Sequence, residues 1–372
     1  MKVALFFTKR LSLVSWNKTG SLSRELSLYK ALQTLGVSFV FISYGGREED
    51  QFLSELPGIT VCYNKWGLPK KIYEFLVPLL HWRTLKNVDL IKTNQMNGAE
   101  IALRASRILR KPFLARCGYL WSKNVALESG GVHSRLSKRV LSIERKVFNG
   151  ADSIVVTSEE AKEAITSRFP QLSSKIDIIP NGVDVSLFKP PEKEKESGRV
   201  LCFVGRLAPE KNLETLFSAL KNIDAELRVI GKGPLKKRLE GVAAGNPKIS
   251  FHGTVPNGQL PLFFNRSNVF VFPTLYEGHP KALIEAMASG LPVVATNVSG
   301  VREIITHMEN GYLCNTDEES LRAGLLTVLN DQDLQIKLGA AARQYALAHY
   351  DLSKLAEREY AVYQQIMCEN ER

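Results

Sequence analysis

The stretch that most constrains this chain covers residues 270–290, FVFPTLYEGHPKALIEAMASG. The apolar run 270–272 and the Pro273 that follows it predict a buried strand and its end. Pro280 suits the first position of a helix, where its missing N–H costs nothing, and apolar residues at helical spacing lead to a stop at residues 290–292. The sequence therefore predicts a strand, a loop and a helix whose free N–H groups attract an anion beside the strand's carboxyl end.

Charged side chains in this stretch favour a ligand. Lys281 lies in the first helical turn, where a cation is disfavoured unless a negative group is close. Glu277 and Glu285 lie eight residues apart, and nothing in this spacing indicates the facing carboxylates of a glycosidase. Two contacts along one elongated ligand fit better. The alternative is a capped surface helix in which Lys281 and Glu285 form a weak i,i+4 pair, and this stretch alone favours neither.

The length and composition favour two domains in a reducing compartment. A chain of 372 residues exceeds the size at which a single core stops growing, and 44% hydrophobic with 23% charged residues is typical of a globular protein. The five cysteines are odd in number and scattered, which argues against a disulfide scaffold or a zinc site. The first apolar run is too short for a signal peptide, and no apolar stretch approaches the roughly 20 residues of a membrane span. We therefore expect a cytoplasmic protein.

The positive charge is concentrated in one half of the chain. The net charge is +11, of which residues 1–180 contribute +12 and residues 181–372 contribute −1. Nucleic acid, an anionic membrane and acidic ligands are all possible partners on charge alone. Residues 70–86 combine aromatic side chains with flanking lysines and arginines, which suits a helix at a membrane surface. An ordinary packing helix between strands is the alternative.

A second charged motif follows the segment 199–204, where the second domain is expected to begin. Arg206 lies at the predicted strand's carboxyl end, where open α/β sheets bind ligands. Pro209 predicts the start of a helix with Lys211 in its first turn, again an unfavourable place for a cation without an anion. Two ordinary surface cations are the alternative. The nearby G-x-G of residues 231–233 is weak evidence for nucleotide binding and predicts a turn after the strand 227–230.

The motif E-G-H-P-K-A-L-I-E, followed by A-M-A-S-G-L-P-V-V-A-T, resembles the E-x7-E signature of the family-4 retaining glycosyltransferases, which have the GT-B fold. The resemblance covers nearly the whole chain and is strongest over residues 178–313. It implies two Rossmann-like α/β domains that face each other across a deep cleft. Residues 1–180 would bind the acceptor, together with a C-terminal helix of about 351–372 that crosses back. Residues 181–350 would bind the nucleotide sugar, and the polar segment 190–198 would link the two domains.

The resemblance also implies roles for single residues. Arg206 and Lys211 would offset charge on the leaving diphosphate, Glu277 would stabilise positive character at the anomeric carbon, and Glu285 would hold the ribose hydroxyls. The first three are the catalytic candidates. Further donor contacts are expected at Gly20, Val255, Gly278, His279, Pro280 and Lys281. Gly20-Ser21 stands where many members have a G-G pair. Arg116 stands where many have a His-Gly pair facing the acceptor; it is the acceptor-side candidate, with a surface arginine as the alternative.

The D-x-D triplet 331–333 resembles a metal site of the other glycosyltransferase fold, but it precedes a predicted helix. An N-terminal cap explains it better, and we expect no metal and no cofactor.

The resemblance thus implies a retaining, metal-independent hexosyltransferase that uses a nucleotide-diphosphate sugar, with UDP-sugars favoured over GDP-mannose. The basic half adds an expectation of peripheral binding to the inner, anionic face of the cytoplasmic membrane. We accordingly expect a lipid-linked or glycan acceptor from the synthesis of a surface polysaccharide such as lipopolysaccharide, or of a glycolipid. The alternatives are a catalytically silent protein of this fold and a nucleotide-sugar epimerase. Nucleic acid is not expected, because no nucleic-acid motif accompanies the charge.

Overall fold

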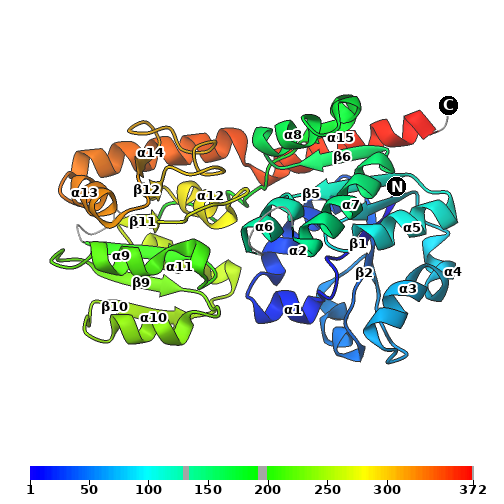
Figure 1. Cartoon of the computed structure of the whole chain (residues 1–372), viewed down its shortest axis with the longest axis horizontal. Helices are drawn as coiled ribbons and strands as arrows, with labels where there is room; N and C mark the ends of the chain where they lie inside the picture. The colour runs from blue at the N-terminus through cyan, green and yellow to red at the C-terminus, as the bar shows by residue number, and fades with distance from the viewer. Residues whose placement is uncertain (129–133, 192–198, 371–372) are drawn as a thin grey trace. The chain divides into compact units, whose positions relative to one another are not determined.

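The computed structural model describes residues 1–128, 134–191 and 199–370, which fall into two compact units shown in Figure 1. The first unit contains Met1–Lys18, Glu25–Pro180 and Leu355–Arg372, and the second contains Thr19–Arg24 and Asn181–Lys354. The short segment Thr19–Arg24 therefore groups with the second unit, although the sequence places it well inside the first half. Most of the expected linker, residues 192–198, lies outside the described residues.

The first unit is built on a seven-stranded parallel sheet with the strand order β3-β2-β1-β4-β5-β6-β7. Its central strands are apolar runs because both of their faces are buried; Val3, Leu5 and Phe39 have no exposed surface. The strands are β1 (Lys2–Phe6), β2 (Ser38–Ile42), β3 (Ile59–Cys62), β4 (Leu90–Thr93), β5 (Phe113–Cys117), β6 (Ser153–Val156) and β7 (Ile176–Ile178).

Helices connect these strands, as parallel pairing requires. Ser134 and Ser158 cap α7 and α8 by accepting from backbone N–H groups at 3.1 and 3.2 Å. The elements are α1 (Leu13–Lys18), α2 (Leu22–Thr34), the 3-10 segment η1 (Arg47–Glu55), α3 (Lys70–Leu80), α4 (Trp82–Leu85), α5 (Ala99–Leu109), α6 (Trp121–Glu128), α7 (Arg135–Asn149), α8 (Glu159–Thr166) and the 3-10 segment η2 (Pro170–Lys175).

The expected helix over residues 70–86 is two helices, α3 and α4, separated at His81. Pro78 lies in the last turn of α3 and has no N–H to donate to the carbonyl of Glu74. Arg104 of α5 donates to that carbonyl instead, at 2.7 Å, and to the carbonyl of Phe75 at 2.7 Å. An arginine from a neighbouring helix thus replaces the hydrogen bond that the proline removes.

The last helix, α15 (Leu352–Asn370), enters the first unit at Leu355, as expected for the helix that crosses back. The fully buried carboxylate of Glu359 pairs with Lys92 of β4 and accepts from Arg116 of β5 at 3.1 Å. Although burial alone raises the pKa of Glu359, the charges of Lys92 and Arg116 outweigh it and lower the pKa below its ordinary value. This buried cluster fixes α15 on the sheet.

The second unit has a six-stranded parallel sheet with the order β10-β9-β8-β11-β12-β13. The strands are β8 (Val200–Val204), β9 (Glu226–Ile230), β10 (Ile249–Gly253), β11 (Val269–Phe272), β12 (Val293–Thr296) and β13 (Tyr312–Cys314). The 3-10 segments are η3 (Pro209–Lys211) and η4 (Asn257–Gln259), and the helices are α9 (Leu213–Ala219), α10 (Lys236–Ala243), α11 (Leu260–Asn265), α12 (Lys281–Ala288), α13 (Glu318–Leu329) and α14 (Gln332–His349).

Strand order places the predicted motifs together. β8 pairs with β9 on one side and with β11 on the other, where Leu201 lies opposite Val269. The direction in which the chain builds the sheet reverses between β8 and β11, and open α/β sheets bind ligands at the carboxyl ends of the strands flanking such a reversal. The loops that follow these two strands carry Arg206 and Glu277. Among the helices of the described part of the chain, none is both long and apolar enough to cross a bilayer.

Candidate functional site

The loop after β8 carries Arg206, and two glycines of the neighbouring loop allow it to adopt its path. Gly231 has a φ of +141°, and a Cβ there would lie 1.8 Å from the carbonyl oxygen of Gly205. A Cβ on Gly233 would lie 2.1 Å from the carbonyl oxygen of Leu207. The G-x-G therefore serves close backbone packing next to Arg206, whose side chain is exposed just after the carboxyl end of β8.

Lys211 ends the 3-10 turn η3, and α9 begins only at Leu213. Pro209 therefore starts a helical turn that contains Lys211, as expected, but this turn is a single 3-10 turn that does not continue into α9, because Asn212 adopts a left-handed conformation (φ +52°) between them. The ammonium group of Lys211 pairs with the carboxylate of Glu277 and lies 5.1 Å from the ring centroid of Phe272. The negative group expected next to Lys211 is therefore the Glu277 carboxylate, which comes from the loop after β11.

The loop that carries Glu277 is fixed on two sides. The fully buried Thr274 hydroxyl donates to the carbonyl of Glu210 at 2.8 Å, which ties the loop to η3. Gly300 has a φ of +76°, and a Cβ there would lie 2.3 Å from the carbonyl oxygen of Gly278 and 2.6 Å from that of Glu277. Gly300 therefore allows a third loop to pass directly against the Glu277 loop.

The helix after this loop, α12, begins at Lys281, one residue later than expected. Pro280 is its N-cap, because its ψ of 107° is extended rather than helical. His279 is buried, with its carbonyl accepting from Asn181 at 2.9 Å and its ring centroid 5.3 Å from that of Tyr350. These contacts orient the first backbone N–H groups of α12, and the N-terminal end of a helix favours an anion.

Glu285 lies in the second turn of α12 and is 2% exposed. Its Oε1 accepts from the Asn257 amide at 2.8 Å and lies 3.6 Å from a guanidinium nitrogen of Arg24. Its Oε2 is buried and makes no hydrogen bond with any residue that the structure describes. Burial raises the pKa of the Glu285 carboxyl, while the charges of Arg24 and Lys281 and the Asn257 hydrogen bond act against this rise.

Two predicted donor-site residues from distant parts of the sequence lie together in the second unit. Gly20 has a φ of +71°, and a Cβ there would lie 2.6 Å from the carbonyl oxygen of Val255. The carbonyl of Gly20 accepts from the N–H of Asn257 at 2.9 Å. Gly20 and Val255 are therefore linked through Asn257 to Glu285, and only a residue without a side chain fits at position 20.

Arg116 takes part in a structural cluster. Its side chain is 7% exposed and donates to Glu359, as described above. We expected the Arg116 guanidinium to face an acceptor. It instead donates to Glu359, and this contact holds Arg116 against α15 inside the first unit.

Sequence reasoning missed two residues, Asn257 and Arg24. Asn257 follows Pro256 in a turn and gives no local signal of its role. Arg24 lies in the first turn of α2, the same unfavourable place for a cation that singled out Lys281, so the same criterion could have found it.

Asp331 is the N-cap of α14 and accepts from the Leu334 N–H at 2.9 Å, which confirms the expected cap. In the described part of the chain no cluster of three or more His, Cys, Asp or Glu side chains is arranged for a metal ion.

Comparison with known proteins gives two family matches that together span most of the chain. Glycosyl transferases group 1 matches residues 184–345 and Glycosyltransferase Family 4 matches residues 26–187. A GDP-mannose-dependent alpha-(1-6)-phosphatidylinositol monomannoside mannosyltransferase of Mycobacterium tuberculosis is 27% identical over 243 residues, covering 58% of this chain and 63% of that protein. More generally, the matches span only 44% to 65% of the length of curated relatives.

Solved structures agree on the fold. Sucrose-phosphate synthase from Thermosynechococcus elongatus superposes with a TM-score of 0.82 at 20% identity, over 99% of this chain and 100% of that one. Anabaena HepE in complex with UDP-glucose gives 0.76 at 18% identity, over 98% and 100%. With both halves matched and both sheets as this fold requires, the chain belongs to the family-4 glycosyltransferases and has the GT-B fold.

Proposed function

We propose that this protein is a retaining hexosyltransferase whose second unit binds a nucleotide-diphosphate sugar and whose first unit binds the acceptor. The observation that carries the proposal is the buried carboxylate of Glu285 with its unpaired Oε2. A buried polar atom without a partner is costly, which favours a ligand that supplies the missing donor. The two neighbouring hydroxyls of a ribose supply such donors to a single carboxylate.

The charges next to Glu285 suit the rest of such a donor. The start of α12, with Gly278, His279 and Pro280 before it and Lys281 in its first turn, offers N–H groups and a cation to a diphosphate. Arg206 and Lys211 follow the neighbouring strand and would offset the charge that develops on the departing diphosphate. Gly20 and Val255 make a close backbone contact next to Asn257. The base of the donor would lie against this contact.

Glu277 is assigned to the donor sugar. It pairs with Lys211, so a bound diphosphate would share this lysine with the carboxylate. In the proposed step, an acceptor hydroxyl oxygen bonds to the anomeric carbon on the face from which the diphosphate departs. The anomeric C–O bond breaks, its electron pair stays with the diphosphate, and the hydroxyl proton passes to a diphosphate oxygen. Glu277 would stabilise the positive character at the anomeric carbon, and the cations would make a divalent metal unnecessary.

Our choice of base and sugar for the donor rests on the names of similar proteins. UDP-sugars are our first choice and GDP-mannose our second, and the names of similar proteins include both chemistries. The acceptor we infer is lipid-linked, in the synthesis of a cell-envelope polysaccharide or glycolipid, because residues 1–180 carry the whole excess of positive charge. Such a surface binds an anionic leaflet reversibly and in a salt-dependent way.

The test is nucleoside-diphosphate release from UDP-glucose and GDP-mannose by the purified protein, with and without a lipid extract as acceptor source. We expect release that the extract accelerates, and a glycolipid product whose anomeric configuration matches that of the donor. A protein that binds the donor without releasing diphosphate would instead be catalytically silent. Recovery of an altered nucleotide sugar would indicate an epimerase. Either result would overturn the proposal.

A further inference from the structure

The surface of α3 and α4 presents apolar side chains to solvent. Ile72, Phe75, Leu79 and Trp82 recur at helical spacing, and all four are exposed, Phe75 by 66% and Leu79 by 60%. The opposite side of α3 packs inward, with Val77 fully buried. A row of large exposed apolar residues on one helical face indicates a surface that another phase or molecule covers.

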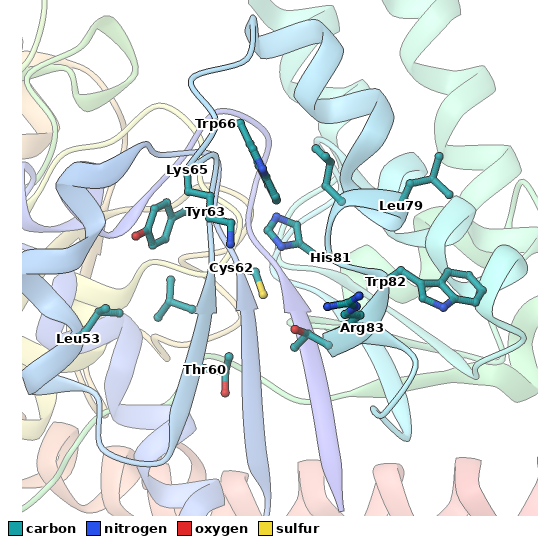
Figure 2. A pocket seen from close by; sticks show the side chains of 13 residues that line it. Leu53, Thr60, Cys62, Tyr63, Lys65, Trp66, Leu79, His81, Trp82 and Arg83 are labelled. Atoms are coloured by element: carbon teal, nitrogen blue, oxygen red, sulfur yellow. The ribbon is translucent and has the colours of Figure 1, made fainter.

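A pocket of about 760 Å³ opens beside this row, at the edge strand β3 (Figure 2). Leu79 and Trp82 belong both to the exposed row and to the pocket wall. On the other side of the pocket, the ring of Trp66 lies 5.3 Å from that of the buried His81, centroid to centroid. The pocket is therefore continuous with the apolar face and has an aromatic wall of its own.

Positive charge lies beside both features, on the side of α3 and α4. Lys65 and Arg83 line the pocket, and Lys65 also lies 5.1 Å from the ring centroid of Trp66. The one acidic residue of α3, Glu74, is buried and bonded to Lys9 at 2.9 Å, so its charge is offset. The η1 side is acidic: Glu48, Asp50 and Glu55 are exposed, and the hydroxyl of Tyr63 donates to Asp50. The exposed cations along the two helices are Lys70, Lys71, Arg83 and Lys86.

We propose that the α3–α4 face lies in the headgroup layer of an anionic membrane and that the pocket takes the phosphate headgroup of one membrane lipid. Apolar and aromatic side chains flanked by Lys and Arg are the composition of a helix that lies in the interface plane, and tryptophan favours that depth. Lys65 and Arg83 supply the charge complementary to a phosphate. This inference deepens the membrane part of the proposed function by naming its surface and ligand, and it does not depend on the reaction.

Helix α7 provides the matched control. It exposes the basic residues Arg135, Lys138, Arg139, Arg145 and Lys146, and Leu136 is its one exposed large apolar residue in the described part of the chain. Binding through α7 would therefore be mainly electrostatic and would weaken strongly at high salt. Binding through α3–α4 has an apolar contribution that salt does not screen.

The experiment measures sedimentation of the full chain with vesicles of phosphatidylglycerol or phosphatidylcholine at low and high salt. We expect the Phe75→Ser/Leu79→Ser variant to lose at least about tenfold in affinity for anionic vesicles at both salt concentrations. Lys65→Ala/Arg83→Ala should lose the preference for phosphatidylglycerol. A variant with glutamine at the five α7 cations should retain salt-resistant binding. Inorganic phosphate should not release the bound protein.

Three results would overturn the inference: wild-type protein that binds no vesicle, loss of binding in the α7 variant with normal binding in Phe75→Ser/Leu79→Ser, or release by inorganic phosphate. Nucleoside-diphosphate release without lipid should be unchanged in the α3 variant. If every protein lacks that release but the vesicle results hold, the proposed reaction fails and the membrane surface remains.

Discussion

Gly300→Ala tests whether the geometry of the Glu277 loop governs turnover. Real Cβ contacts are essentially never shorter than 3.0 Å, whereas a Cβ on Gly300 would lie 2.3 Å from the carbonyl oxygen of Gly278. The backbone at residue 300 and the carbonyl of Gly278 must therefore move apart by at least about 0.7 Å, which is the difference between these two distances. The substitution also places an alanine at a φ of +76°.

These two consequences have different readouts. The left-handed conformation costs about 1–2 kcal/mol of folding stability for a residue with a Cβ. Displacement of a catalytic group by about 1 Å can cost on the order of 10²-fold in rate. We expect Gly300→Ala to lose roughly 10- to 100-fold in kcat while remaining folded, since the shift moves the carboxylate of Glu277 relative to the anomeric carbon.

Gly36→Ala is the matched control. Gly36 has a similar φ of +85°, but a Cβ there would meet no atom within 4 Å. It therefore carries the conformational cost without the displacement. Thermal unfolding and nucleoside-diphosphate release are measured for both variants. Comparable turnover in Gly300→Ala and Gly36→Ala would refute the reasoning, because the loop would then have moved without consequence.

Three further predictions concern charge. Glu277→Gln should lower turnover far more than donor affinity, whereas Lys211→Ala should lower both, and near-normal turnover of Glu277→Gln would contradict the assigned role. Turnover should survive EDTA; complete loss that manganese or magnesium restores would contradict the charge argument. Burial lowers the pKa of His81 in the folded protein from 6.5 to about 4. As pH falls, the imidazole therefore takes up its second proton in the unfolded chain before it does so in the folded one. Wild-type stability to urea should therefore drop between pH 6.5 and 4 by up to about 3 kcal/mol more than that of His81→Gln, and equal losses would contradict this.

The sequence predicted the second unit well because its signals are local. Buried parallel strands are short apolar runs that end at glycine or proline, so the strand before Pro273 could be located from its own residues. The start of α12 was misplaced by one residue, since a proline suits both the cap and the first turn. The start of α9 was missed because Asn212 takes a left-handed conformation that its identity permits but does not require.

Partners far apart in the sequence could not be predicted. Arg116 lies 243 residues from Glu359, and nothing near either residue indicates the other. The same holds for Glu285 and its neighbours Arg24 and Asn257, which come from three separate segments. For residues 70–86, the pattern indicated an amphipathic helix, but only the structure shows that Phe75 faces solvent. Periodicity groups residues on one face and does not say what that face contacts.

The central claim is that the second unit holds a nucleoside diphosphate between Glu285 and the cations after β8. Calorimetric titration with UDP and GDP tests it most directly, using wild type, Glu285→Gln, Arg206→Ala and, as a control, the exposed cation variant Lys248→Ala. We predict that at least one diphosphate binds and raises folding stability by about 2.7 kcal/mol at 100 times its Kd. Glu285→Gln and Arg206→Ala should bind it more weakly, while Lys248→Ala binds it normally. Binding of neither nucleotide, or equal affinity in all four proteins, would contradict the account.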